Sequence, residues 1–297
     1  LSKRPMSRIV DPLTSMGHEI STNRGKAPIQ IIGGNIKDNF EYVMPIASAQ
    51  VKSSLMLASL SSGNSIKITE AKITRDHTEK MIEYLGGSIE VSESSEGKVI
   101  FLKNSKLSKI STYEVVGDFS SAAFIIVAAL ISKNSEVMIK NVGLNKTRSG
   151  LLEVLLKMNA NIEIVNKSKT CNEDCGDIIV KSSQLVGINV PNSIIPNIID
   201  EIPILSVAAS FADGQTTIKN AFELKVKESD RLHSISMGLK AMNISHDLLD
   251  DGLIINGTQD DVEIHEEIES FGDHRIAMSF LVAGLRSKNG VKVKDCS

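Results

Sequence analysis

The stretch with the most suggestive chemistry is residues 225–232, Lys-Val-Lys-Glu-Ser-Asp-Arg-Leu, where two lysines, two carboxylates and an arginine fall within seven residues. The apolar periodicity of residues 232–242 predicts a helix directly after it. If the charged stretch forms the loop and first turn, Glu228 and Arg231 share a helix face, with Lys227 at or near the N-cap. A carboxyl group between cations there could donate a proton while the cations bind an anionic substrate. The alternative is a solvated capping turn with an ion pair, the commoner outcome for a run of charges.

A second group of polar residues opens the predicted apolar helices. These residues are Ser48, Asp118, Asp200 and Asp273, all of types that cap helix N-termini. If the helices pack around a common axis, their N-termini point into one cleft that attracts anions. The simpler interpretation is capping alone, worth about 1 kcal/mol for each residue.

Five cations are expected around the same cleft. They would suit a ligand with two or more phosphate or carboxylate groups, because hydrogen bonds between charged partners are the strong ones. These cations are Arg4, Arg75, Lys227, Arg231 and Arg275.

The elements that must position these residues recur along the chain. In each copy a polar residue opens an apolar helix rich in small residues, and a lysine-bearing strand follows. An arginine then leads an amphipathic helix, after which come two short strands. The arginines at this position are Arg75, Arg148 and Arg231. A partial unit precedes the first copy and another begins at Asp273, so we expect the chain to start and end inside a repeat.

The repeats predict an α/β protein of β-α-β-α-β-β units with buried helices and outer sheets. The first helix of each unit is apolar nearly all round, which indicates burial. Apolar and polar residues alternate along the strands, as expected for sheets with one solvent-exposed face. We expect two domains, residues 1–115 and 116–297, joined near the loop at 111–117. The helices predicted to be buried are residues 53–60, 122–130, 204–212 and 276–285.

Composition excludes several classes of function. A length of 297 residues predicts one to three domains, with two as the default. A net charge of −3, with only 8 Phe, 3 Tyr and no Trp, argues against nucleic-acid binding. No apolar run approaches the roughly 18 residues of a membrane span. We expect a cytoplasmic, monomeric protein that binds small molecules.

The cysteines indicate neither a disulfide framework nor a metal site. There are 3, an odd number, which favours free thiols in a reducing compartment. Cys171 and Cys175 lack a second ligand pair, so a polar turn is a better interpretation than zinc.

Seven motifs together resemble one known family, the 5-enolpyruvylshikimate-3-phosphate (EPSP) synthases, in their Ser-Ala-Gln bacterial form. Each motif alone is weak, but their order and spacing match over essentially the whole chain. The motifs are residues 3–6 (Lys-Arg-Pro-Met), 48–53 (Ser-Ala-Gln-Val-Lys-Ser), 75–79 (Arg-Asp-His-Thr-Glu), 117–123 (Gly-Asp-Phe-Ser-Ser-Ala-Ala), 200–203 (Asp-Glu-Ile-Pro), 225–232 and 273–278 (Asp-His-Arg-Ile-Ala-Met).

The resemblance implies a two-domain, inside-out α/β barrel of six repeated units. It implies transfer of the enolpyruvyl group of phosphoenolpyruvate to shikimate 3-phosphate with release of phosphate, in the biosynthesis of aromatic amino acids. Neither a metal nor an organic cofactor is implied.

The resemblance also implies roles for residues at matching positions. Asp200 would accept the proton of the attacking hydroxyl group, and Glu228 would protonate the methylene carbon of phosphoenolpyruvate. The implied catalytic residues are Asp200, Glu228 and Lys227. The implied shikimate 3-phosphate site is Ser48, Ala49, Gln50, Arg75, Asp200 and Lys227. The implied phosphoenolpyruvate site is Arg4, Gln50, Arg231 and Arg275.

The chemistry of the residues agrees with these roles. Addition to an enol ether followed by elimination needs an acid and a base on opposite sides of one carbon. Asp200, expected at a helix N-terminus, should be ionised. Glu228 can be neutral only if the cleft closes and excludes water.

The chain departs from the family pattern in three places. An N-terminal segment with a lysine and a glycine-rich loop has no counterpart before Leu1, and a C-terminal lysine has none after Ser297. We therefore expect a chain truncated at both ends, which could be inactive alone. Glu223 stands where other members carry Asn.

Three alternatives remain. A UDP-N-acetylglucosamine enolpyruvyl transferase would need a reactive cysteine in the first domain, but no cysteine precedes Cys171. An RNA 3′-phosphate cyclase-like protein is disfavoured by the acidic balance and the scarcity of aromatic residues. A non-catalytic anion-binding module of the same fold would keep the arginines without turnover.

Overall fold

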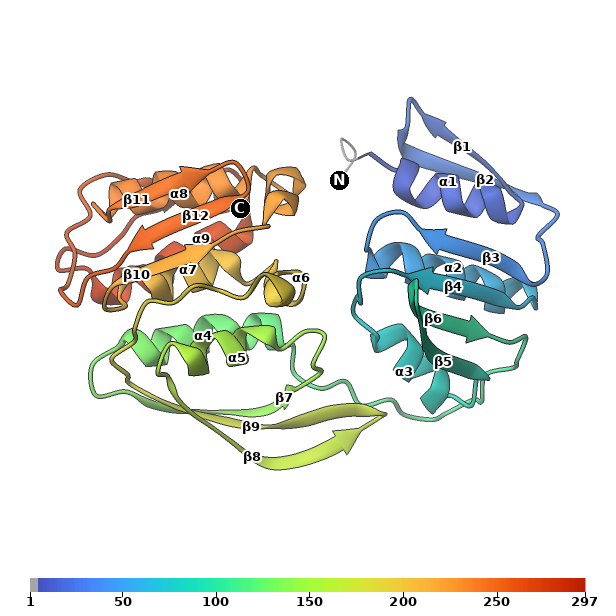
Figure 1. The fold of residues 1–297 in the computed structure, drawn as a ribbon, viewed down its shortest axis with the longest axis horizontal. Coiled ribbons are helices and arrows are strands. Elements are labelled where there is room, and N and C mark those ends of the chain that lie inside the picture. The colour runs from blue at the N-terminus through green and yellow to red at the C-terminus, as the bar shows by residue number, and fades with distance from the viewer. Residues whose placement is uncertain (1–4, 297) are drawn as a thin grey trace. The chain divides into compact units, whose positions relative to one another are not determined.

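The computed structural model describes residues 5–296, and their contacts divide the chain into two units, Leu1–Glu114 and Val115–Ser297. Figure 1 shows both units as layers of helices and sheets. Each unit has a hydrophobic core of its own.

The first unit, drawn in blue to green in Figure 1, contains three helices and six strands among its described residues. Strands β3, β4, β6 and β5 form one sheet in that order, with β3 parallel to β4 and the other pairs antiparallel. The elements are α1 (Ser7–Met16), β1 (His18–Asn23), β2 (Lys26–Gly34), β3 (Phe40–Met44), α2 (Ala49–Ser62), β4 (Ile66–Glu70), α3 (His77–Tyr84), β5 (Ile89–Ser94) and β6 (Gly97–Leu102).

The core of the first unit lies between α2 and this sheet. Leu55 and Met56 of α2 are completely buried, as are Ile68 of β4 and its partner Ile100 of β6. Apolar side chains on one face of the sheet therefore cover one face of the helix, which is the pairing that their alternation predicts.

The second unit is built around three of its helices, α4, α7 and α9. Strands β7, β9 and β8 form one antiparallel sheet, and β10, β12 and β11 form another. The helices are α4 (Phe119–Ile131), α5 (Gly150–Lys157), α6 (Ile195–Ile198), α7 (Ile202–Ser210), α8 (Arg231–Ala241) and α9 (His274–Ala283), with 3₁₀ turns η1 (Asn192–Ile194), η2 (Phe222–Val226) and η3 (Gly284–Arg286). The strands are β7 (Glu136–Gly143), β8 (Asn161–Thr170), β9 (Glu173–Lys181), β10 (Gln215–Ile218), β11 (His246–Leu249), β12 (Gly252–Asn256), β13 (Ile268–Glu269) and β14 (Val293–Lys294).

Helices α4, α7 and α9 pack against one another, and the sheets lie outside them (Figure 1). Every residue of α7 is buried. Its two serines suit this position because Ser206 and Ser210 donate their hydroxyl protons to backbone carbonyl oxygens one turn earlier, at 2.8 Å each. The predicted burial of 204–212 is confirmed, and so is that of 122–130 apart from Ile125, which is 49% exposed. The mixed α/β architecture with helices inside sheets is also confirmed in this unit.

Helices α2 and α9 are less completely buried than predicted. Leu57 of α2 is 55% exposed and Leu281 of α9 is 51% exposed. The described elements pack against only part of each helix surface, which apolar composition alone does not reveal.

Within the described residues, no single helix is long and apolar enough to span a membrane. One sharply bent pair, 192–198 with 202–210, meets the length and composition criteria only when its two helices are taken together.

Candidate functional site

The charged stretch ends in a cap that differs from the predicted one. Helix α8 begins at Arg231, and its N-cap is Asp230, whose side chain accepts a hydrogen bond from the backbone N–H of His233 at 3.1 Å. The prediction of Lys227 at the N-cap is wrong, since an aspartate oxygen can accept from the first turn and an ammonium group cannot. Glu228 therefore precedes the helix and does not share a helix face with Arg231.

Arg231 nevertheless contacts Glu228, within a buried fork of hydrogen bonds. The Arg231 side chain is 1% exposed. Its Nη2 donates to Oε2 of Glu228 at 2.7 Å, and its Nε donates to Oδ2 of Asp273 at 2.7 Å. Its Nη1 lies 3.3 Å from Oδ1 of Asp200. One guanidinium group thus joins three carboxylates from separate segments of the chain.

Asp200 lies in the turn between α6 and α7, where cations surround it. Nη1 of Arg148 lies 3.1 Å from Oδ2, and Nζ of Lys227 lies 3.6 Å from Oδ1. Burial alone raises the pKa of Asp200, but the charges of Lys227, Arg275 and Arg148 outweigh it and hold the pKa well below its ordinary value. This carboxylate is therefore ionised.

The expectation that Asp200 caps a helix is wrong. The N-cap of α7 is Glu201, which makes no capping hydrogen bond with its side chain. The other three predicted caps are confirmed: Ser48 accepts from the N–H of Val51, Asp118 from those of Ser120 and Ser121, and Asp273 from that of Arg275.

Arg275 reaches the same cluster from α9. Its Nη1 donates to the Ser120 hydroxyl at 2.5 Å and to the backbone carbonyl of Asp200 at 3.2 Å. The Ser120 hydroxyl donates in turn to Glu201, which is 1% exposed. Burial raises the pKa of Glu201 above its ordinary value, although the charges of Arg148 and Arg275 act in the opposite direction.

Arg148 belongs to this cluster, although it was not predicted as a site residue. It lies 3.9 Å from Asp118 and 3.8 Å from Glu201, in addition to its contact with Asp200. The signal that could have identified it is the repeat, in which Arg148 occupies the position of Arg75 and Arg231.

Lys227 also contacts the residue that departs from the family pattern. Its Nζ lies 2.6 Å from Oε1 of Glu223, and its side chain is 19% exposed. The departure therefore supplies a carboxylate partner to a predicted substrate-binding lysine.

In the first unit, the candidate residues lie at the start of α2 and just before α3. Ser48 caps α2, Ala49 and Gln50 open it, and Arg75 is half-buried two residues before α3. Arg4 lies outside the described residues.

A buried ion-pair cluster joins these two helices. Lys52, completely buried, lies 2.6 Å from Glu79 and 3.2 Å from Glu70. The hydroxyl groups of Ser53 and Thr78 lie 2.6 Å apart. These contacts hold the first half of α2 against the first turn of α3, to which Arg75 leads.

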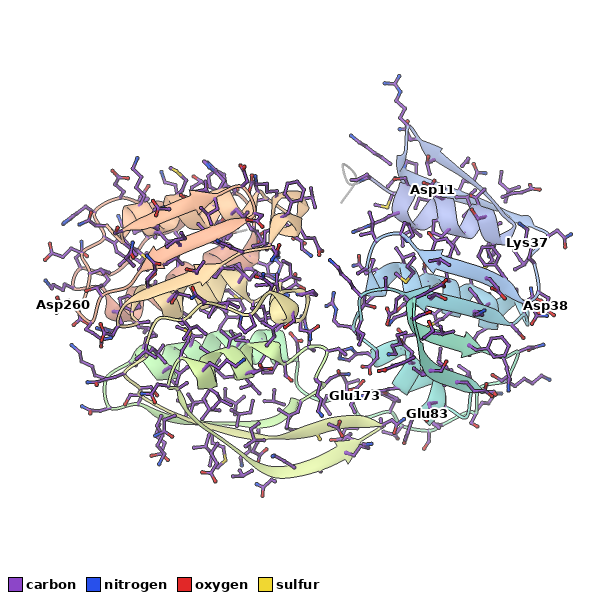
Figure 2. All side chains as sticks on the ribbon, viewed as in Figure 1. Asp11, Lys37, Asp38, Glu83, Glu173 and Asp260 are labelled. Atoms are coloured by element: carbon purple, nitrogen blue, oxygen red, sulfur yellow. The ribbon has the colours of Figure 1, made fainter. Side chains whose placement is uncertain are left out.

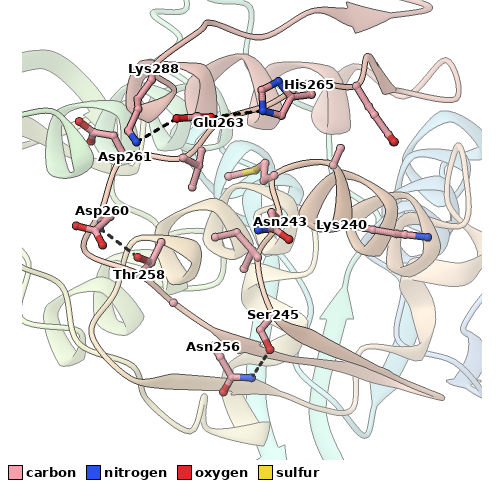
Figure 3. Close-up of a pocket in the computed structure, with 16 residues that line it drawn as sticks. Lys240, Asn243, Ser245, Asn256, Thr258, Asp260, Asp261, Glu263, His265 and Lys288 are labelled. Carbon is pink, nitrogen blue, oxygen red and sulfur yellow. Dashed lines mark hydrogen bonds and ion pairs between the residues drawn. The ribbon is translucent and has the colours of Figure 1, made fainter.

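A separate pocket of about 790 Å³ lies in the second unit, where α8 ends (Figure 3). Its lining includes Asp260, which Figure 2 shows at the outer edge of that unit. None of the predicted site residues lines it, and its charges pair locally: Lys288 lies 3.2 Å and His265 3.5 Å from Glu263. It therefore lacks the converging cations of the Asp200 cluster.

No group of His, Cys, Asp or Glu within residues 5–296 is arranged to hold a metal ion. Cys175, which is buried, and Cys296, which is exposed, are free thiols.

Comparisons with known proteins add an independent finding. The sequence model of the family described as EPSP synthase (3-phosphoshikimate 1-carboxyvinyltransferase) matches residues 1–297. A 3-phosphoshikimate 1-carboxyvinyltransferase of Bartonella quintana is 43% identical over an alignment of 298 residues, gaps included, that covers 99% of this chain and 67% of that protein. One of a Thermoanaerobacter species is 45% identical over 296 residues, 99% of this chain and 68% of that protein.

Solved structures agree. EPSP synthase of Acinetobacter baumannii superimposes with a TM-score of 0.87 at 39% identity, covering 100% of this chain and 67% of that one. The enolpyruvyl transferase NikO of Streptomyces tendae, at 14% identity and a TM-score of 0.68, shares the fold and covers 100% of this chain and 68% of its own. The chain thus spans about two thirds of the length of these relatives. From the family match and the identity of these relatives, we conclude that the chain belongs to the EPSP synthase (3-phosphoshikimate 1-carboxyvinyltransferase) family.

Proposed function

We propose that the chain catalyses transfer of the enolpyruvyl group from phosphoenolpyruvate to shikimate 3-phosphate, with release of phosphate. The observation that supports this best is Asp200, an ionised carboxylate in contact with Arg148, Arg231 and Lys227. A base held beside cations is what an addition between two anionic substrates requires.

In the proposed addition, Asp200 accepts the proton of the attacking hydroxyl group as its oxygen bonds to C2 of phosphoenolpyruvate. Glu228 donates a proton to the methylene carbon, C3. In the elimination the bond between C2 and the phosphate oxygen breaks, Glu228 takes back a proton from C3, and the proton on Asp200 leaves with phosphate. Every step is a proton transfer or a change of a C–O bond, and we assign these steps to the side chains alone.

Glu228 needs a proton before it can act as the acid. The side chain of Glu228 pairs with Arg231 at 2.7 Å and is 34% exposed. We propose that phosphoenolpyruvate displaces Glu228 from Nη2 of Arg231, since a planar guanidinium group suits a carboxylate or phosphate. Loss of the positive partner and of water would then favour the protonated form of Glu228.

The substrate sites follow the family motifs. Positively charged and N-terminal helix groups suit phosphate and carboxylate ligands. We assign shikimate 3-phosphate to Ser48, Ala49, Gln50, Arg75, Asp200 and Lys227. We assign phosphoenolpyruvate to Arg4, Gln50, Arg231 and Arg275. We also retain a monomeric state and a cytoplasmic location as predictions.

The test measures phosphate released from phosphoenolpyruvate by the protein as its gene encodes it. We expect release only when shikimate 3-phosphate is also present. Release with UDP-N-acetylglucosamine in its place would favour the other enolpyruvyl transferase. If calorimetry detects binding of either anion while no phosphate is released, a non-catalytic anion-binding module is the better description.

A further inference from the structure

We propose that Arg148 is a positioning residue for Asp200. It orients this carboxylate and keeps it ionised throughout the reaction, while the other cations near Asp200 bind the substrates. The inference rests on the proposed function and deepens it. The sequence motifs do not include Arg148, and only the folded arrangement brings it to Asp200.

The two oxygens of Asp200 have different partners. Oδ2 faces Nη1 of Arg148 at 3.1 Å, whereas Oδ1 faces Arg231 at 3.3 Å and Lys227 at 3.6 Å. Contacts on both oxygens define the plane of the carboxylate. Removing Arg148 would take away the cation that contacts Oδ2.

Arg148 is itself held by the protein. Its side chain is 14% exposed, and two further carboxylates, Asp118 at 3.9 Å and Glu201 at 3.8 Å, lie beside its guanidinium group. Its backbone N–H donates to the carbonyl of Asn145 at 2.8 Å. With three carboxylates around it, Arg148 is poorly placed to bind a substrate anion, so its charge stays with Asp200.

The other charges near Asp200 differ in this respect. The substrate anions of the proposed reaction would contact Lys227, Arg231 and Arg275, and would offset their positive charge at Asp200. Arg148 would then be the main cation that keeps Asp200 ionised. Within residues 5–296, the charged groups that face Asp200 directly or through these cations include Arg148, Lys227, Arg231, Arg275, Glu201, Asp118, Glu223, Glu228 and Asp273.

This arrangement resolves a conflict in the proposed mechanism. A carboxylate with a deeply lowered pKa is a weak base, and catalysis is best when the pKa lies nearer the working pH. When substrates offset three of the cations, the pKa of Asp200 rises toward its ordinary value. Arg148 limits that rise and keeps the proton acceptor available.

The variant Arg148→Gln tests the proposal through the pH profile of kcat. Asp200 must be ionised to accept a proton. We therefore expect kcat to decrease as the pH drops below the pKa of Asp200 in the substrate complex. Removal of Arg148 raises that pKa, so we expect the acidic limb to move to higher pH. We also expect kcat at neutral pH to fall about 10²-fold, because the base is misplaced.

Two further variants separate charge from geometry. Arg148→Lys keeps the positive charge but lacks the planar guanidinium group. Its acidic limb should therefore stay near that of the parent protein, while kcat remains low. Lys146→Gln removes the same charge from an exposed position in the same loop and should leave the profile unchanged. An acidic limb that does not move in Arg148→Gln would overturn the proposal and leave Arg148 a structural role only.

A second measurement does not depend on turnover. The ¹³C resonance of the Asp200 carboxyl group, assigned with Asp200→Asn, should titrate at higher pH in Arg148→Gln than in the parent protein. Equal titration in the two proteins contradicts the proposal, even if no phosphate release is found. Absence of phosphate release from the parent protein, by contrast, contradicts only the proposed function.

Discussion

At the scale of single residues, the cluster around Asp200 contains contacts between residues close in the sequence and contacts between distant ones. Glu228 and Arg231 are three residues apart and form the ion pair considered for this stretch, although Glu228 lies before the helix and not on its face. The contact of Asp200 with Arg148 joins segments 52 residues apart, so no local pattern indicates it. Electrostatics at this scale decides which carboxylate is ionised and which can carry a proton.

Glu228→Gln is expected to lower kcat by roughly 10²–10⁴, because an amide cannot donate the proton that C3 requires. The fold should remain intact, since Gln keeps the size of Glu and the position is 34% exposed on its side chain. Steady-state kinetics measures the loss and circular dichroism checks the fold. Glu266→Gln, at an exposed glutamate of the same unit, is the matched control. An unchanged kcat in Glu228→Gln would remove this residue from the mechanism.

At the scale of elements, caps determine where the central helices begin. Asp118 accepts hydrogen bonds from the backbone N–H groups of Ser120 at 3.2 Å and Ser121 at 2.9 Å. Sequence type and position were enough to predict this cap. They were not enough for Asp200, because the tight turn that follows α6 places the N-cap of α7 at Glu201.

Asp118→Ala is expected to destabilise the second unit by about 1 kcal/mol through loss of the cap. Burial raises the pKa of Asp118, but its hydrogen bonds and the charge of Arg148 lower that pKa by more, so the net shift is downward. A lowered folded-state pKa stabilises the protein above the unfolded-state value of about 3.9, and this contribution is lost as the pH falls. Thermal melts should therefore show a difference in Tm at pH 7 that shrinks toward pH 3.

The control for that prediction is Asp260→Ala, which removes an exposed aspartate that caps no helix. Its Tm should match that of the parent protein at both pH values. A constant difference for Asp118→Ala between pH 7 and pH 3 would show that its charge contributes nothing.

Helix packing gives a second prediction at this scale. Gly238 of α8 faces the ring of Phe280 in α9 so closely that a Cβ atom there would lie 1.9 Å from Cζ. Gly238→Ala should therefore destabilise the protein by about 1–3 kcal/mol through overpacking, despite the better helix propensity of alanine. Denaturant unfolding measures the change.

Replacement of the ring should relieve the clash. In a double-mutant cycle, Gly238→Ala should cost less in a Phe280→Leu background than in the parent protein. Additive effects would show that Phe280 is not the group that the new methyl meets.

At the scale of the whole molecule, the two units have separate hydrophobic cores. Met16, Leu55, Ile68 and Ile100 belong to the core of the first unit, whereas the core of the second is formed around α4, α7 and α9. The repeats predicted this kind of layered α/β unit, because apolar helices and alternating strands each need a partner surface.

Ile68→Ala is expected to destabilise the first unit by about 2–5 kcal/mol, because it leaves a cavity at a completely buried position. Since the cores are separate, hydrogen exchange should show lost protection within residues 5–114 and little change beyond them. Equal loss of protection in both units would indicate that they unfold as one cooperative body.

The sequence by itself determined the positions of most helices, three of the four predicted caps and, through motifs in a fixed order, membership of the family. These properties depend on residues a few positions apart, because helix periodicity and capping act within one or two turns. Only the tertiary structure decided that Arg148 contacts Asp200 and that Arg231 is buried among three carboxylates. Those outcomes depend on how α4, α7, α8 and α9 pack, and a pattern within one segment carries no information about which distant charges the packing brings together.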